Sequence, residues 1–103
     1  MHADIAEKRE ALAALCRYGV ARLEVFGSAA RGGDFDPGRS DFDFLVEFEP
    51  RSDLPLEQFL GFAESLEQQL GRPVDLIERE ALDASRNFIR RRAILRDAHR
   101  VYG

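Results

Sequence analysis

The chain has 103 residues, a length that suits one domain with a modest hydrophobic core, so we expect a single domain over residues 1–103. Apolar residues make up 45% and charged residues 33%, as in ordinary globular proteins, which excludes disordered and fibrous classes. The formal net charge of -4 argues against strong nucleic-acid binding, which needs a basic face.

Nothing in the sequence points to a membrane or secreted protein. Its uncharged stretches fall far below the roughly 18 apolar residues of a membrane span, and the N-terminus carries charges where a signal peptide is apolar. Cys16 is the only cysteine, and its helical spacing from Leu12 predicts a small buried hydrophobe. The two histidines, His2 and His99, are too far apart in sequence to suggest a site. We expect a cytoplasmic protein.

The first predicted elements are a helix over 5–18 and a strand over 20–26. Asp4 followed by Glu7 is typical of a capping box, apolar residues then recur at helical spacing, and Gly19 supplies a stop. The segment that follows is short, rich in β-forming residues and alternating, which predicts a strand.

A turn-rich loop and a second strand come next. Residues 28–40 are small and polar, and within them 29–31 are compatible with one helical turn. From Asp41 to Glu49 apolar and polar residues alternate, which predicts a strand with one apolar side. The apolar side consists of Phe42, Phe44, Val46 and Phe48.

The C-terminal half predicts a helix over 55–70, a strand over 74–77 and a helix over 85–98. A proline at the start and a glycine after the end bound the first of these helices. The last helix is expected to place three apolar residues on one side: Phe88, Ile89 and Leu95. Residues 101–102 fit an edge strand or a packed tail. This order predicts a small α/β (α+β) domain in which helices cover the Phe-rich sheet face and the other face keeps carboxylates.

Three carboxylates are candidates for chemistry. Asp41 and Asp43 are two residues apart on a strand, so they leave the same face with attachment points roughly 6.6 Å apart. Such a pair suits one or two Mg²⁺ ions, although an exposed acidic edge has the same pattern. Asp75 interrupts an apolar strand, where a charge is costly without a partner. A three-carboxylate cluster is favoured over an edge-strand aspartate paired with an arginine.

A second candidate region follows the first strand. Gly27 lets the backbone approach an anion, the Ser28 hydroxyl can donate to a phosphate oxygen, and a following helical turn offers free N–H groups. If the ligand is a triphosphate, the Arg31 guanidinium would donate further hydrogen bonds to it. The alternative is an ordinary tight turn. No Walker motif or dinucleotide fingerprint is present.

Four motifs occur in order along the chain: Gly27-Ser28, Arg31-Gly32, Ser40-Asp41-Phe42-Asp43 and Val74-Asp75-Leu76. This ordered set resembles the nucleotidyltransferase superfamily of DNA polymerase beta, in its small MNT form. The resemblance covers nearly the whole chain and includes the terminal run from Ile94 to Ala98. It implies a mixed sheet with helices packed on it, the nucleotidyltransferase fold.

The resemblance also implies a two-metal site. Asp41 and Asp43 would bridge two Mg²⁺ ions, and Asp75 would complete the second site. The nucleotide, ATP, would be held by four residues: Gly27, Ser28, Arg31 and Ser40. An acceptor hydroxyl would attack the α-phosphate, and pyrophosphate would leave.

Several functions remain open at this point. MNT proteins of this type resemble antitoxins paired with a HEPN-domain RNase, and some attach AMP to a tyrosine of that partner, in complexes that can be oligomeric. A binding module that blocks its partner by occlusion is the alternative. A small-molecule nucleotidyltransferase is disfavoured because no acceptor-binding domain follows the core. Six arginines against one acid from residue 86 onward fit a solvated helix face or a docking surface.

Overall fold

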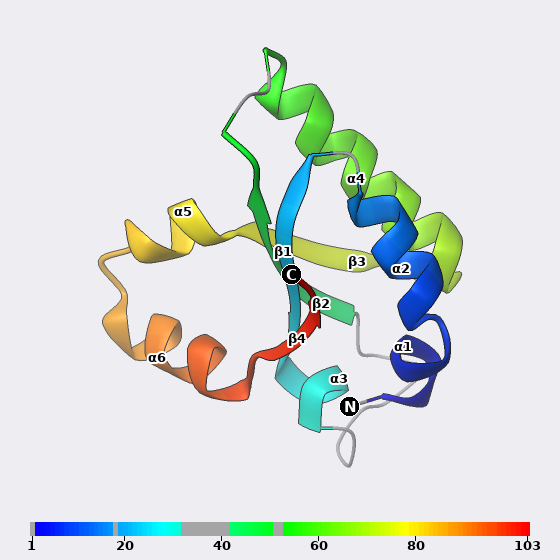
Figure 1. Cartoon of the computed structure of the whole chain (residues 1–103). Helices are drawn as coiled ribbons and strands as arrows, with labels where there is room; N and C mark the ends of the chain where they lie inside the picture. Colours follow the sequence, from blue (N-terminus) through cyan, green and yellow to red (C-terminus); the bar gives the residue numbers. More distant parts are fainter. Residues whose placement is uncertain (1, 18, 32–41, 51–52) are drawn as a thin grey trace.

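The computed structural model describes residues 2–17, 19–31, 42–50 and 53–103 (Figure 1). The predictions for Ser40 and Asp41 therefore lie outside the described residues. Within these ranges, no helix combines the length and apolar character of a membrane span.

A mixed sheet in the order β3-β2-β1-β4 forms the centre of the molecule. β1 (Val20–Phe26) pairs antiparallel with β2 (Phe42–Phe48) and with β4 (His99–Tyr102). β3 (Val74–Glu78) pairs parallel with β2. The predicted mixed sheet is thus confirmed, with β3 at one edge and the C-terminal strand β4 at the other.

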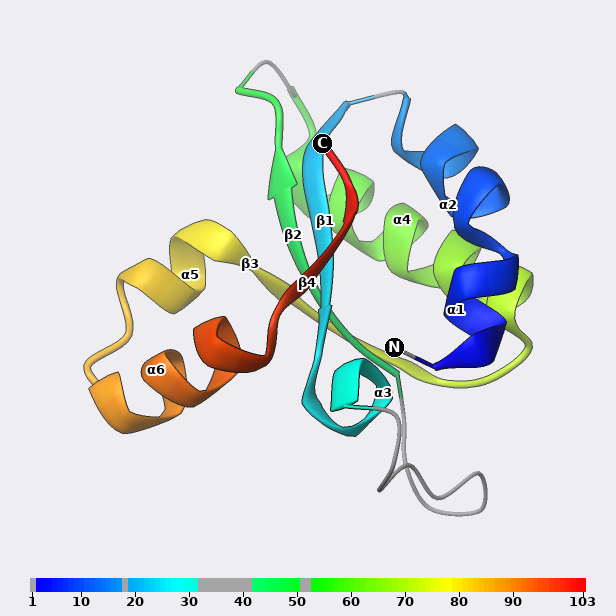
Figure 2. The same ribbon diagram turned by 60° about the horizontal axis from the view of Figure 1, so that its bottom comes forward.

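The large core lies on the side of the sheet that carries α1, α2 and α4 (Figure 2). Alternation along β2 points its phenylalanines to this side, where Phe42 and Phe44 are fully buried. α4 (Pro55–Leu70) has a proline in its first turn and ends at Gly71, whose φ of 72° is the left-handed conformation that glycine tolerates. These boundaries agree with the sequence prediction.

The predicted N-terminal helix is wrong in two respects. It divides at Lys8 into α1 (Ala3–Glu7) and α2 (Arg9–Cys16). The N-cap is His2, whose Nδ1 accepts from the Asp4 N–H at 3.1 Å, and not Asp4 in a capping box. Because His2 N–H also donates to the Ala29 carbonyl at 2.7 Å, the start of the chain is tied to the segment after β1.

The opposite face of the sheet carries more than carboxylates. α5 (Arg79–Asp83), which was not predicted, and α6 (Phe88–Asp97) cover it and form a second, smaller apolar cluster. The buried members of this cluster are Phe26, Leu45, Leu82 and Ile94. Ile94 is the buried residue of α6, whereas Phe88 and Ile89 are 59% and 72% exposed. Phe88, Ile89 and Leu95, which the sequence prediction placed on one side of the helix, are all exposed, so the helix packs through Ile94 instead.

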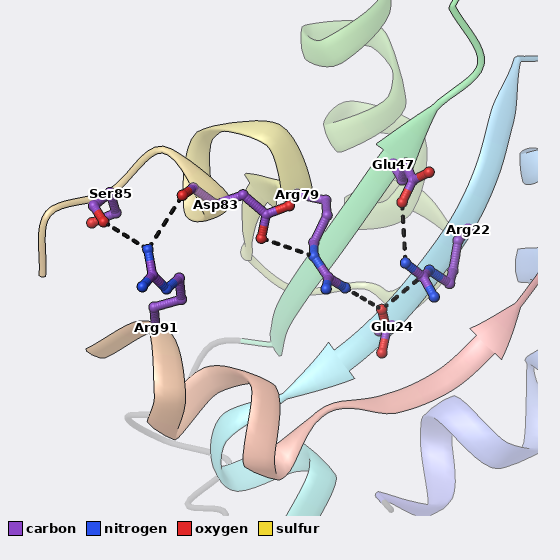
Figure 3. Close-up of polar contacts among 7 residues, drawn as sticks. All are labelled: Arg22, Glu24, Glu47, Arg79, Asp83, Ser85 and Arg91. Carbon is purple, nitrogen blue, oxygen red and sulfur yellow. Dashed lines mark hydrogen bonds and ion pairs between the residues drawn. The ribbon is translucent and has the colours of Figure 1, made fainter. Parts of the chain in front are cut away.

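Ion pairs hold α5 to the sheet beside this cluster (Figure 3). The guanidinium groups of Arg22 and Arg79 converge on Glu24 Oε1 at 3.4 Å and 3.5 Å. Arg79 also pairs with Asp83 at 3.2 Å, one turn further along α5. Arg91 of α6 donates to the backbone carbonyls of Asp83 and Ser85, which fixes the connection between the two helices.

Candidate active site

Asp43 and Asp75 come together because of the parallel pairing of β2 with β3. The two residues are direct partners in the register, so their side chains leave the same face of the sheet. This placement agrees with the expectation that the third strand lies beside the second and brings Asp75 close to Asp43. Within the described part of the chain, Asp75 makes no ion pair with an arginine, and it is exposed.

The exposure of Asp75 differs from what its apolar sequence neighbours suggest. β3 is an edge strand, so the carboxylate stays in contact with solvent and its desolvation cost is small. The apolar residues on either side of Asp75 in the sequence therefore did not indicate that Asp75 itself is buried. The carboxylate is accessible from outside the sheet edge, which suits a ligand to an incoming cation or substrate.

Gly27 brings the end of β1 against the Asp43 carboxylate. Its φ of 70° lies in the left-handed region, and a Cβ at this position would be 2.5 Å from Asp43 Oδ2. Any side chain would therefore meet both backbone strain and the carboxylate. Gly27 and Asp43, separate in sequence, therefore lie side by side at this end of the sheet.

A short helix, α3 (Gly27–Arg31), starts at this glycine and places Ser28 in its first turn. Backbone N–H groups of a first helical turn lack intrahelical acceptors and are suited to phosphate oxygens. Ala29 and Ala30 are the buried residues of this helix, and their small side chains let it lie close to the sheet. The helical turn compatible with 29–31 is confirmed and starts two residues earlier.

Arg31, the last residue of α3, contacts a residue near the C-terminus of the chain. Its Nη1 donates to Oδ2 of Asp97, at the end of α6, at 2.5 Å. The Arg31 side chain is 48% exposed, so it lies at the surface of the site and not in the core. Asp97 was not predicted as a site residue, and the only signal for it was its place in the terminal run from Ile94 to Ala98.

The donor set fits divalent metal ions that prefer oxygen ligands. Asp43 and Asp75 supply carboxylates on one face, and the third predicted ligand, Asp41, lies outside the described residues. Among the residues that the structure describes, no group of three His, Cys, Asp or Glu side chains could hold a metal ion. Completion of the proposed site therefore depends on Asp41.

Cys16 is not a nucleophile for this site. Its side chain is buried in the large core, and burial raises the pKa of the thiol to about 12. The thiol is therefore protonated at neutral pH, and the thiolate is the reactive form. The sequence prediction of a small buried hydrophobe is confirmed.

Comparison with known proteins defines the class. The family model described as "Nucleotidyltransferase domain" matches residues 8–96, so the chain belongs to the nucleotidyltransferase domain family. A solved structure assigned as a minimal nucleotidyltransferase has a TM-score of 0.71 and 34% identity, and the match covers 96% of this chain and 95% of that one. The predicted nucleotidyltransferase fold is confirmed.

Two curated relatives are more specific. The protein adenylyltransferase MntA of Thermococcus cleftensis is 42% identical over 67 residues, and the Methanocaldococcus jannaschii protein MJ1379, assigned as a protein adenylyltransferase, is 36% identical over 66. Each match covers 64% of this chain, and the matched region spans 63% and 64% of the relatives.

A similar fold also occurs in a toxin-antitoxin complex. The structure of a tri-AMPylated Shewanella oneidensis HEPN toxin with its MNT antitoxin matches with a TM-score of 0.63 and 16% identity. That match covers 96% of this chain and 72% of the other. At this identity the similarity concerns the fold alone.

Proposed function

We propose that residues 1–103 form one minimal, metal-dependent nucleotidyltransferase domain that moves AMP from ATP to an acceptor hydroxyl in the cytoplasm. The observation that carries this proposal is the convergence of Gly27, Asp43 and Asp75 at one end of the sheet. A backbone turn suited to phosphate oxygens lies there beside two carboxylates, and this arrangement supports phosphoryl transfer as the proposed chemistry.

The proposed reaction needs little covalent chemistry from the protein. The acceptor hydroxyl gives up its proton to solvent as its oxygen attacks the α-phosphorus in line, the bond to the bridging oxygen of the β-phosphate breaks, and pyrophosphate leaves with that electron pair. Mg²⁺, when bound, would neutralise phosphate charge and lower the pKa of the acceptor hydroxyl. Asp41, Asp43 and Asp75 would hold it, while Gly27 and Ser28 orient the β- and γ-phosphates.

We propose a tyrosine of a HEPN RNase toxin as the acceptor and an antitoxin role for this chain. The relatives named protein adenylyltransferase and the fold shared with an MNT antitoxin support this proposal. The exposed edge position of Asp75 leaves that side of the site open, so a hydroxyl on a protein partner can approach it.

The outer face of α6 is the surface we propose for docking that partner. A shallow hollow there is lined by Phe88, Arg91, Arg92, Leu95 and Arg96. Exposed apolar side chains beside guanidinium groups are typical of protein interfaces, and the positive charge selects an acidic partner segment. The end of this helix lies at Arg31, so a partner seated on it would be next to the site.

Mass spectrometry of a co-expressed HEPN partner, with and without this chain, tests the proposal. We expect a mass increase of one or more AMP units with the wild type and none with Asp43→Asn. The matched control is Asp53→Asn, which removes the same charge from an exposed residue just before α4 and should transfer AMP normally.

A catalytically silent module that binds and occludes its partner is the alternative outcome. In the transferase, Asp43→Asn still binds the partner in size-exclusion chromatography but no longer suppresses its RNase activity. Full suppression by Asp43→Asn, with no AMP on the partner, would establish occlusion. Docking is tested with Arg92→Glu, because Arg91 also fixes the α5–α6 connection, and Arg86→Glu, before the helix, is the control.

A further inference from the structure

The terminal run from Ile94 to Ala98 links the end of the chain to the nucleotide site. Ile94 is buried in the smaller apolar cluster with Phe26 and Leu45, and Ala98 packs against the same cluster. Phe26 immediately precedes Gly27, so this cluster seats the end of α6 directly beside the start of α3. The packing of Ile94 and Ala98 in this cluster therefore determines the position of Asp97 between them.

Asp97 uses this position to contact Arg31. Its side chain is 16% exposed, so the carboxylate is partly shielded, and Oδ2 accepts from Arg31 Nη1 at 2.5 Å. The other oxygen, Oδ1, lies 3.7 Å from Arg96 Nε, whose side chain is 74% exposed. A short charge-assisted hydrogen bond to a partly buried carboxylate restrains a guanidinium more strongly than a solvent-exposed ion pair.

Arg31 needs such a restraint because its own helix gives little. α3 has five residues, and Arg31 is the last of them, so its long side chain starts from a helix end. An unrestrained arginine side chain loses much rotamer freedom when a ligand fixes it, and this entropy loss opposes binding. A guanidinium is a planar fork with five donors, and a hydrogen bond at one nitrogen narrows the range of orientations in which the others donate.

We propose that Asp97 is a positioning residue of the nucleotide site: it holds the Arg31 guanidinium in the orientation that binds the triphosphate. This inference rests on the proposed function, since it assigns a role in ATP binding. The inference also assigns a role to the terminal run: Ile94 and Ala98 pack the end of α6 against the sheet, and Asp97 acts through Arg31.

A double-mutant cycle on nucleotide affinity tests this role. Calorimetric titration with AMP-PNP and Mg²⁺ compares the wild type, Asp97→Asn, Arg31→Ala and the double variant. We expect Asp97→Asn to weaken binding roughly tenfold, the value of one charge-assisted hydrogen bond. Arg31→Ala should lose as much or more, and adding Asp97→Asn to it should cost nothing further, because Asp97 acts only through Arg31.

Two further variants separate positioning from structural damage. Asp83→Asn removes a carboxylate that also pairs with an arginine, within α5, and it should bind AMP-PNP like the wild type. Arg31→Lys keeps the charge without the planar fork and should recover only part of the affinity. Thermal melting of each variant shows whether a loss of affinity follows a loss of fold.

The outcomes distinguish the inference from the function on which it rests. If the wild type binds AMP-PNP and Asp97→Asn binds it equally well or more tightly, Asp97 does not position Arg31, while the proposed function stands. An equal loss from Asp97→Asn with and without Arg31 also excludes the positioning role. If the wild type itself does not bind AMP-PNP with Mg²⁺, the proposed function fails, and the role of Asp97 fails with it.

Discussion

The two faces of the sheet differ in what they bury. One face carries the large core under α1, α2 and α4, where Phe42, Phe44 and Val46 of β2 are fully buried. The other carries a small apolar cluster, a chain of ion pairs (Figure 3) and the two described carboxylates of the site, Asp43 and Asp75. Apolar burial is therefore concentrated on the face that carries no predicted site residue.

This division follows from the alternation of a single strand. Phe42, Asp43 and Phe44 are consecutive, so the pleat sends the aspartate to one face and both phenylalanines to the other. The strand thus holds the Asp43 carboxylate between two phenylalanines that anchor it in the core. Changes to the carboxylates should affect chemistry with little loss of stability, and changes to the phenylalanines should do the opposite.

The largest effect on chemistry is expected at Asp43. Asp43→Asn removes a carboxylate of the proposed metal site, so Mg²⁺-dependent transfer should fall below detection. Melting should stay unchanged or rise slightly, because Asp43 and Asp75 repel each other when no cation is bound. Asp41→Asn should behave alike. Substantial Mg²⁺-dependent turnover by either variant would rule out that residue as a ligand.

The next effect contrasts the two apolar clusters. Phe44→Ala should lower the free energy of unfolding by about 3–5 kcal/mol, because it leaves a large cavity in the main core. Ile94→Ala, in the smaller cluster, should cost about 2–3 kcal/mol, since fewer neighbours surround it. Urea unfolding measures both. If Ile94→Ala proved the more damaging, the main core would not dominate stability.

The smallest effects are expected at the phosphate-binding turn. Ser28→Ala removes one neutral donor, so the affinity for AMP-PNP should fall roughly two- to tenfold. Gly27→Val should be worse, because it places a β-branched side chain at positive φ and against the Asp43 carboxylate. Kinetics and melting of both variants provide the check, and a harmless Gly27→Val would remove the basis for phosphate binding here.

The sequence alone determined the elements whose signals are local. Strict alternation identified β2, and Pro55 with Gly71 bounded α4, because proline and glycine act on the backbone of their own segment. Local signals also failed where competing contacts existed. Asp4 and Glu7 fit a capping box, yet His2 caps α1 while its N–H bonds to Ala29, a contact that no local pattern contains.

Only the tertiary structure decided which distant residues meet. The parallel register of β2 with β3 makes Asp43 and Asp75 partners, and the edge position of β3 leaves Asp75 exposed although its sequence neighbours are apolar. The pairing of Arg31 with Asp97 joins residues 66 positions apart. Periodicity reports which side of an element is apolar, whereas strand order and helix packing, which depend on the whole chain, decide what that side faces.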